Sequence, residues 1–463
     1  MEGRLMYLKL AYRNVRRSVR DYSVYFATLA FAACLLYSFT ASTEYLLALD
    51  LTSDQRGFYE SASMVMEAFS VFTVLVFAFL ISYASKFILR RRSQEFGMYG
   101  LLGMPPTVMG RILAYEGCLV GVFALVCGVG LGVLLSPAFG AVAAFVFQVP
   151  WRLALVFSGK AAMWTCGCFA AIMALATWRG VRSMKKRTLG QLLEARRAPK
   201  EPRRRGLFSP ALQLVAGVLI LLLIYGMCLF SPVNFIMGIL PLGVLAVFAT
   251  GMIFRFAALR WPQWARKRPE RYFRGLRFFE MRQVENQVGL SANAMACTCV
   301  LLACGMCMMV AGLAFSVGMR QPGMGAAAEA LASIGFVGLF YGVTFLVAAA
   351  AVLALQQLAD AADGVGRYRL LRQLGCSDGQ LKGAVRGQVG VYFVAPMAFA
   401  LVHAVFGFAL IGFLAFVLGS AHYAVITGAV VAVTLALMAV YYVITCRESQ
   451  RILLEQGADA AAA

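Results

Sequence analysis

The sequence predicts an all-α polytopic membrane protein with ten transmembrane helices. Hydrophobic residues make up 61% of the 463 positions, charged residues only 14%, and the mean hydropathy is +0.78. A soluble domain of this length could not bury that much apolar surface. The apolar residues also fall into long runs that are separated by short, mostly basic segments. These observations together predict many membrane crossings.

The net charge of +21 is explained by membrane topology. Basic residues collect in the cytoplasmic loops of membrane proteins. If ten spans leave both termini in the cytoplasm, all but four of the 42 Lys and Arg residues fall on the inner side. The four outer ones are Arg56, Arg152, Lys160 and Arg320. No nucleic-acid motif accompanies the charge, so we expect a lipid bilayer and no nucleic acid as its surroundings.

The first part of the chain is expected to hold an amphipathic helix and four spans. Residues 1–20 alternate basic and apolar side chains at helical spacing, which predicts a helix on the inner membrane surface. The four spans are predicted at residues 22–42, 62–89, 112–135 and 161–178. A strongly basic linker follows at residues 179–206. Its charge could bind anionic lipid or a partner, although topology alone explains it.

Six further spans are expected after this linker. Two of them, residues 211–230 and 235–259, form a hairpin that turns at Ser231-Pro232. A second basic amphipathic stretch, residues 273–281, precedes the last four spans. These four are predicted at residues 289–318, 334–358, 389–416 and 424–445.

A short segment between the second and third spans stands out. Three arginines, Arg90 to Arg92, place its start at a membrane surface. A helix is predicted at residues 96–102, and Pro105-Pro106 ends it because neither proline can donate the next N–H. A short helix on the basic side of the membrane is a place where a cytoplasmic partner can bind.

The same pattern recurs near residues 366–376. Setting Gly103 on Gly375 pairs Phe96 with Tyr368, Met98 with Leu370, Leu102 with Leu374 and Glu116 with Gln388. Spans one to four then match spans seven to ten, and the two intervening spans give both copies the same orientation. The sequence therefore predicts two parallel four-helix repeats, residues 1–206 and 261–463, joined by a two-helix hairpin at 207–260.

Three stretches of the sequence form a recognisable pattern: residues 8–17 with Asp21-Tyr22, residues 86–92 with 95–99, and residues 356–358 with 367–371 and 374–375. In this order they are similar to the FtsX-like permease family of ABC transporters. Within that family they most resemble the ten-span BceB-like permeases of bacitracin and antimicrobial-peptide resistance. The resemblance implies a protein of the bacterial cytoplasmic membrane.

The resemblance also implies two coupling helices, near residues 93–104 and 366–376, that dock on two ABC ATPase subunits. The expected coupling residues are Glu95, Phe96, Met98, Tyr99, Leu102 and Gly103, and then Arg367, Tyr368, Leu370, Leu371, Leu374 and Gly375. For the apolar members, the alternative is a simple anchor in the lipid surface. For Glu95, the alternatives are an exposed loop charge and a partner for an ATPase arginine.

The chain itself is not expected to be an enzyme. Its one Gly-Lys pair, Gly159-Lys160, is followed by Ala161 and lacks the upstream glycine of a Walker A motif. ATP and Mg²⁺ are therefore expected on the partner ATPase, with no cofactor in this chain. The twelve cysteines lie mostly in apolar runs without histidines at ligand spacing, so neither a metal site nor a disulfide framework is expected.

One departure from the BceB-like pattern leaves the cargo open. Those permeases carry a large extracellular domain between spans seven and eight, where this chain has only residues 319–333. The expected function is transmission of ATPase motion to an extracellular or outer-leaflet amphiphile, such as an antimicrobial peptide or a lipid-linked precursor. The alternatives are a regulatory scaffold that signals to a sensor kinase or cell-wall hydrolase, and a secondary transporter. A second permease is a further candidate partner.

Two polar side chains fall within predicted spans, Glu116 and His403. Ionisable groups at such depths are costly and often functional. For Glu116, the alternative is an interfacial carboxylate paired with Arg111 or capping a neighbouring helix. For His403, a proton-linked site and a hydrogen-bonded packing histidine are both open.

Overall fold

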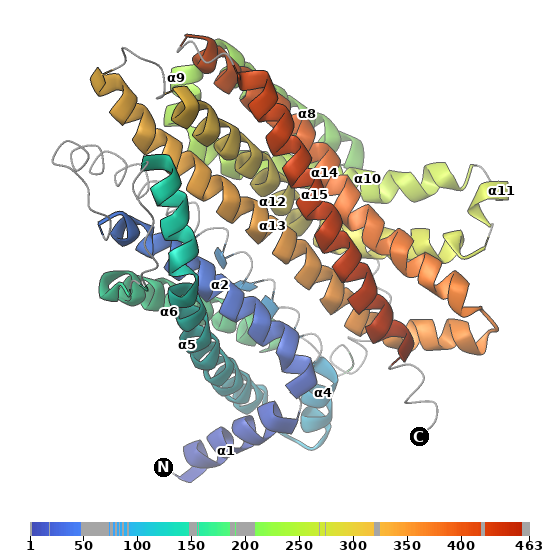
Figure 1. Ribbon diagram of the computed structural model, residues 1–463. Coiled ribbons are helices and arrows are strands. Elements are labelled where there is room, and N and C mark those ends of the chain that lie inside the picture. Colours follow the sequence, from blue (N-terminus) through green and yellow to red (C-terminus); the bar gives the residue numbers. More distant parts are fainter. Residues whose placement is uncertain are drawn as a thin grey trace. The chain divides into compact units, whose positions relative to one another are not determined.

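The computed structural model describes most of the chain and is helical throughout the described part (Figure 1). The described residues are 2–17, 19–47, 74, 77–78, 81–82, 84–85, 88–89, 92–147, 155, 157–185, 190, 209–267, 269–273, 275–318, 325–417 and 422–455. No strand occurs among them. The predicted all-α fold is confirmed for this part of the chain.

Eight helical segments in the described part are long and apolar enough to cross a membrane. They are Pro106–Leu135, Gly159–Lys185, Pro210–Phe230, Pro241–Trp261, Ala292–Ser316, Gly335–Ala361, Asp378–Phe416 and Tyr423–Leu454. They coincide with the third to tenth predicted spans, and they mark the chain as a membrane protein. The first predicted span contains a shorter apolar stretch, Tyr25–Ser38, and the second lies mostly outside the described residues.

The helices separate into two compact units, Met1–Pro199 and Lys200–Ala463. The first unit contains α1 (Glu2–Arg17), α2 (Val19–Leu47), α4 (Ser93–Leu101), α5 (Pro106–Phe147) and α6 (Gly159–Lys185). Its centre is the packing of α2 against α5, with α6 contacting both helices. In Figure 1, α1 leaves the line of α2 at an angle, and its residues contact α5.

Glycine brings α2 and α5 into close contact. A Cβ on Gly128 would lie 2.5 Å from the carbonyl oxygen of Ala30, and one on Gly132 would lie 2.6 Å from the Tyr37 ring. A methyl group at either position would therefore push the helices apart. Gly130, between them, faces open space. Two of these three glycines thus serve helix packing.

The second unit is a larger helical bundle. It contains α8 (Pro210–Phe230), α9 (Pro232–Met237), α10 (Ile239–Ala265), α11 (Pro269–Tyr272), α12 (Arg277–Gly318), α13 (Gly325–Gln373), α14 (Asp378–Val417), α15 (Tyr423–Gln450) and a final π-helical turn, η1 (Arg451–Glu455). The long helices α12 to α15 run alongside one another (Figure 1). The helix breaks at Ser231-Pro232, where the sequence predicts a turn, since α8 ends at Phe230 and α9 begins at Pro232, and α10 then packs against α8.

Helix α13 differs from the prediction in its extent. A separate short helix was expected near residues 366–376, but these residues continue the 49-residue helix α13 to Gln373. The preceding residues, 358–362, are leucine, alanine and aspartate, and none of them breaks a helix. The helix therefore persists until the turn at Gly375, where φ is +87°.

Candidate functional site

The short helix α4 lies where the sequence predicts it. It begins after Arg92 and ends at Leu101, and Gly103 follows with φ of +85°. Its end is a Schellman motif, in which the N–H of Met104 donates to the carbonyl oxygen of Tyr99 and that of Gly103 donates to Gly100. Glycine suits this position because its missing Cβ permits the left-handed conformation.

The end of α13 forms the same turn with the same set of backbone hydrogen bonds. In α4 the backbone bonds run from Leu102 to Met98 (3.1 Å), Gly103 to Gly100 (3.1 Å) and Met104 to Tyr99 (3.0 Å). In α13 they run from Leu374 to Leu370 (3.0 Å), Gly375 to Arg372 (3.0 Å) and Cys376 to Leu371 (3.1 Å). The two sets match in the register that sets Gly103 on Gly375. The local geometry thus agrees with the pairing that the sequence suggested.

Both turns present apolar side chains to the surroundings. Leu102 is 84% exposed and Leu374, its counterpart, is 72% exposed. Met98, Leu101 and Leu370 are also exposed. We call Met98, Leu101, Leu102 and Gly103 the first tip, and Leu370, Leu374 and Gly375 the second tip. Exposed leucines at a helix end indicate a surface that another molecule covers.

The remaining predicted coupling residues lie beneath or beside the tips. Phe96 and Tyr368 are both buried and cannot contact a partner directly. Phe96 packs with Leu89, Met109, Leu113 and Met184, and Tyr99 lies at the edge of this cluster. Leu371 and Glu95 are partly buried, whereas Arg367 is exposed.

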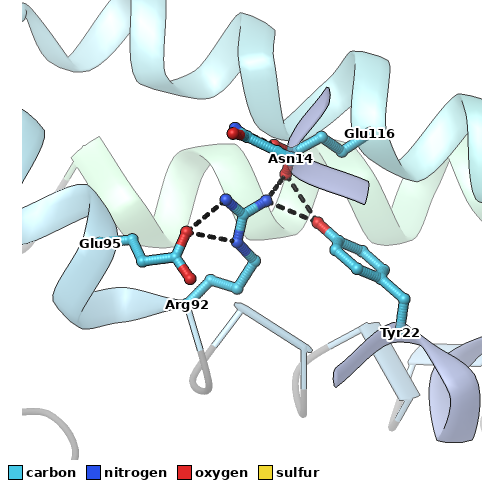
Figure 2. A network of polar contacts seen from close by, with 5 residues as sticks. All are labelled: Asn14, Tyr22, Arg92, Glu95 and Glu116. Carbon is cyan, nitrogen blue, oxygen red and sulfur yellow. Dashed lines mark hydrogen bonds and ion pairs between the residues drawn. The ribbon is translucent and has the colours of Figure 1, made fainter. Parts of the chain in front are cut away.

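Beneath the first tip, Arg92 is the centre of a buried polar network (Figure 2). Its guanidinium lies between Glu95 on one side and Glu116 and Tyr22 on the other. The distance from Arg92 Nε to Glu95 Oε2 is 3.1 Å, and that from Nη1 to the Tyr22 hydroxyl is 2.6 Å. The Arg92 and Glu116 side chains form an ion pair, and each is only 1% exposed.

The carboxylate of Glu116 accepts two further hydrogen bonds. The Tyr22 hydroxyl donates to Oε2 at 2.8 Å, and Asn14 Nδ2 donates to Oε1 at 2.9 Å. The five residues come from α1, α2, the start of α4, α4 itself and α5. The network therefore fastens the short helix to three other helices of its unit.

The network keeps Arg92 charged. Burial alone would lower the pKa of Arg92, but the Tyr22 oxygen and the carboxylates of Glu116 and Glu95 outweigh it and raise that pKa. A buried ion pair of this kind is held by its partners, because either charge left alone would lack solvation. The guanidinium also lies 5.4 Å from the Phe96 ring centroid, which joins the polar network to the apolar cluster.

The partner expected for Glu116 was wrong. Sequence reasoning suggested Arg111, but that side chain is exposed and the carboxylate pairs with Arg92 instead. Residues five apart on an α-helix point about 140° away from each other, so Arg111 cannot share the buried face with Glu116. Sequence reasoning also missed Asn14 and Tyr22, although both lie in the family-like stretch that ends at Tyr22.

Among the described residues, the Arg92–Glu116 pair has no counterpart at the equivalent positions of the second tip. In the register that pairs the tips, Gly364 takes the place of Arg92 and Gln388 that of Glu116. The Tyr368 hydroxyl donates to Gln388 Oε1 at 3.4 Å, and its ring meets Phe279 edge-on at 5.6 Å between centroids. Burial and the nearby Glu280 raise the pKa of Tyr368, so this hydroxyl stays protonated. The two tips thus rest on chemically different supports.

His403, on α14, joins three helices in the core of the second unit. Its Nδ1 is hydrogen-bonded to the hydroxyl of Tyr225 on α8, and its Nε2 to Thr250 Oγ1 on α10 at 3.0 Å. Tyr225 in turn stacks on Phe406 with 3.9 Å between ring centroids. Hydroxyl groups thus engage both ring nitrogens, as in a packing histidine. Within the described part of the chain, no cluster of His, Cys, Asp or Glu is arranged to hold a metal ion.

Comparison with known proteins finds a family match over the part of the chain that contains α4, α5 and α6. Residues 67–186 match the family described as FtsX-like permease C-terminal. This range includes α4, Arg92, Glu95 and Glu116.

Three relatives illustrate the similarity. The bacitracin export permease protein BceB of Bacillus subtilis is 24% identical over 259 residues, which is 53% of this chain and 39% of the relative. The BceB protein of Halalkalibacterium halodurans is 27% identical over 183 residues, or 39% and 27% of the two chains. The uncharacterized ABC transporter permease YvcS of Bacillus subtilis is 22% identical over 191 residues, or 41% and 29%.

The matched part of the chain therefore spans less than two fifths of the length of each of these relatives. Such relatives are membrane transport components rather than enzymes. Residues 67–186 thus match the FtsX-like permease family, and the chain is similar to ABC transporter permeases, BceB proteins among them.

Proposed function

We propose that this chain is the permease subunit of an ATP-driven ABC complex and that its two tips receive the motion of ATPase subunits. The observation that carries the proposal is the repeated turn, in which the same backbone bonds present exposed leucines at two places. An anchor in the lipid surface would require apolar tips but no common turn geometry. Two equivalent tips suit a partner that is supplied as two copies.

The proposed topology has ten spans in two parallel repeats, residues 1–206 and 261–463, around a hairpin at 207–260. In this topology both termini and both tips lie in the cytoplasm. The excess of Lys and Arg in these segments favours the cytoplasmic side of the membrane. ATP and Mg²⁺ would be bound by the ATPase subunits. This chain would contribute binding surfaces and moving helices.

The two tips would transmit force differently. Motion of the first tip passes through the Arg92 network into α1, α2 and α5, because side chains from all of these helices meet there. The second tip is the end of α13, so its motion acts directly on a helix that contains a candidate span. The first tip would therefore act through the buried Arg92 network, and the second tip through the continuous helix α13.

The proposed cargo is an extracellular or outer-leaflet amphiphile, such as an antimicrobial peptide or a lipid-linked precursor. Two of the relatives are named bacitracin export permeases, which supports this class. The rival function is a regulatory scaffold that passes the state of the ATPase to a sensor kinase or a cell-wall hydrolase. It would use the same tips without moving a cargo.

The test is purification of the tagged full chain in mild detergent from its native host, followed by the mass of the intact complex. We expect two ATPase copies per permease. The double variant Leu102→Asp and Leu374→Asp should lose the ATPase while keeping its normal elution as a folded membrane protein, since both side chains are exposed. The matched control is Phe273→Asp, an exposed apolar residue outside both tips, which should retain it.

Undiminished ATPase binding in the double variant would overturn the assignment of the tips. A complex with ATPase that moves no amphiphile in reconstituted vesicles would instead favour the regulatory scaffold.

A further inference from the structure

The end of helix α10 carries a groove lined by aromatic and basic side chains. The groove has no part in the proposed transmission of ATPase motion through the two tips. The groove has a volume of about 400 Å³ and is lined by Phe256, Ala257, Arg260, Trp261, Gln263, Trp264 and Lys267. The apolar span of this helix ends at Trp261. The groove thus lies where the helix passes from the apolar to the polar layer of a membrane.

The groove is built on one face of the helix. Phe256, Arg260 and Trp264 are spaced four residues apart, which places them one above another. Beyond the helix end, the N–H of Lys267 donates to the carbonyl oxygen of Trp264 at 3.2 Å, so the chain keeps turning. Trp261 is 64% exposed and Trp264 is 69% exposed. Exposed tryptophans at this depth are typical of the interface with lipid headgroups.

The two cations of the groove, Arg260 and Lys267, have no acidic partner in the part of the chain that the structure describes. Arg260 lies over the Phe256 ring at 6.0 Å and donates to Gln263 at 3.5 Å. Among the described residues, no carboxylate lies within ion-pair distance of Arg260 or Lys267.

The neighbouring arginines are different. Arg266 and Arg282 share the carboxylate of Glu285, at 3.9 and 3.4 Å. The single carboxylate of Glu285 therefore offsets part of the charge of these two arginines, whereas no described carboxylate offsets the charge of Arg260 or Lys267 in the groove. A ligand that completes the groove has to bring negative charge.

An apolar stripe continues from the groove along α10 toward the middle of the span. Leu245, Phe248 and Met252 precede Phe256 at intervals of three and four residues, so the four side chains share one face. Leu245 and Phe248 are exposed, and Met252 is partly exposed. A ligand with a charged head in the groove would find room for its chains along this stripe.

We propose that this groove binds an anionic glycerophospholipid, with its phosphate between Arg260 and Lys267 and its acyl chains along the stripe. A guanidinium can hold two phosphate oxygens at once, and the lysine ammonium adds a second positive charge. The tryptophans would pack against the glycerol and upper acyl region. A zwitterionic lipid fits less well, because its own cation would lie close to Arg260 and Lys267. The site requires only that this end of α10 faces the anionic leaflet, and it is independent of ATPase binding.

Intrinsic fluorescence offers a direct test, since the sequence has five tryptophans and two of them line the groove. Replacing Trp151, Trp164 and Trp178 by Phe leaves Trp261 and Trp264 as the only reporters. The full chain is placed in nanodiscs of phosphatidylcholine that contain increasing brominated phosphatidylglycerol or, in parallel, brominated phosphatidylcholine. Bromine quenches only tryptophans in contact with the labelled chains.

We expect brominated phosphatidylglycerol to quench at a much lower mole fraction than brominated phosphatidylcholine. The double variant Arg260→Gln and Lys267→Gln should weaken this preference by roughly thirtyfold, since each cation near an anionic headgroup is worth about fivefold in affinity. The control Lys382→Gln and Arg386→Gln removes the same charge from exposed positions on α14 and should keep the preference.

Equal quenching by the two lipids would overturn the proposal. So would a loss of preference in the control, which would indicate a general charge effect, or release of the lipid by inorganic phosphate alone. If the double variant fails to fold, the exchange Arg260→Lys with Lys267→Arg keeps both charges. This exchange should preserve the preference for phosphatidylglycerol, and its loss would count against the site.

Discussion

The guanidinium of Arg92 and the carboxylate of Glu116 form an ion pair from which solvent is almost excluded, beneath the exposed leucines of α4. The pair joins the residue just before α4 to a residue almost three turns into α5. It therefore fixes the short helix against a candidate membrane span. Its stability and its importance for transmission can be tested separately.

Removing one member of this pair should be far more harmful than removing both. Arg92→Ala leaves the buried carboxylate of Glu116 without its cation, and Glu116→Ala leaves the buried guanidinium with only the partly exposed Glu95 as counter-ion. Breaking a buried pair in this way costs about 3–5 kcal/mol. The double variant Arg92→Met and Glu116→Leu, which fills the space with apolar side chains, should recover much of that loss. Thermal stability in detergent, followed by the fraction that remains monodisperse, measures the difference. If the double variant is as unstable as the sum of the single ones, the two residues do not act as a pair.

The contribution of Tyr22 to the stability of the network should come from its hydroxyl group alone. The hydroxyl accepts from Arg92 and donates to Glu116, so Tyr22→Phe leaves two buried charged groups short of a partner. The expected cost is about 1–3 kcal/mol. Tyr99→Phe is the matched control, because that ring keeps its edge contact with Phe96 and should change stability little. Equal effects of the two substitutions would show that the Tyr22 hydroxyl contributes nothing special.

Substitution of the two tip glycines should destabilise the protein because of their backbone conformation. Gly103 and Gly375 have φ of +85° and +87°, and a Cβ at either position would meet no atom within 4 Å. Alanine there is strained by roughly 1–2 kcal/mol without any steric clash. Asparagine tolerates this conformation better, so Gly103→Asn should be milder than Gly103→Ala.

Gly383 is the control, because its substitution by alanine should change the stability of the protein in the opposite direction. It lies within helix α14, where a Cβ would also meet open space. Gly383→Ala should therefore stabilise the protein by up to about 1 kcal/mol, because alanine is the better helix former. Equal destabilisation at all three glycines would contradict the argument from backbone conformation.

The sequence allowed the tips to be predicted because local signals define them. The arginines before α4, the prolines after it and the glycine between them determine where the helix can begin and end. The continuity of α13 was missed, since nothing in residues 358–373 distinguishes one long helix from two. The partner of Glu116 could not be inferred either. Arg92 lies 24 positions earlier, and only the packing of α2, α4 and α5 brings the two side chains together.

His403 should act as a packing residue whose hydrogen bonds depend on one another. His403→Leu would leave the buried Thr250 hydroxyl and the partly buried Tyr225 hydroxyl without their partner. The expected cost is about 1–3 kcal/mol for Thr250 and less for Tyr225. Adding Tyr225→Phe and Thr250→Val removes those orphaned hydroxyls and should restore part of the stability. The measurement is the thermal stability of the single and triple variants in the same detergent.

This experiment also separates the two interpretations of the histidine. A packing residue predicts that the triple variant regains function together with stability, because no proton needs to move at His403. A proton-linked site predicts a stable triple variant that still fails to act on the proposed amphiphile in vesicles. That second outcome would indicate a functional role for His403 and would favour an ion-coupled transporter over an ATP-driven one.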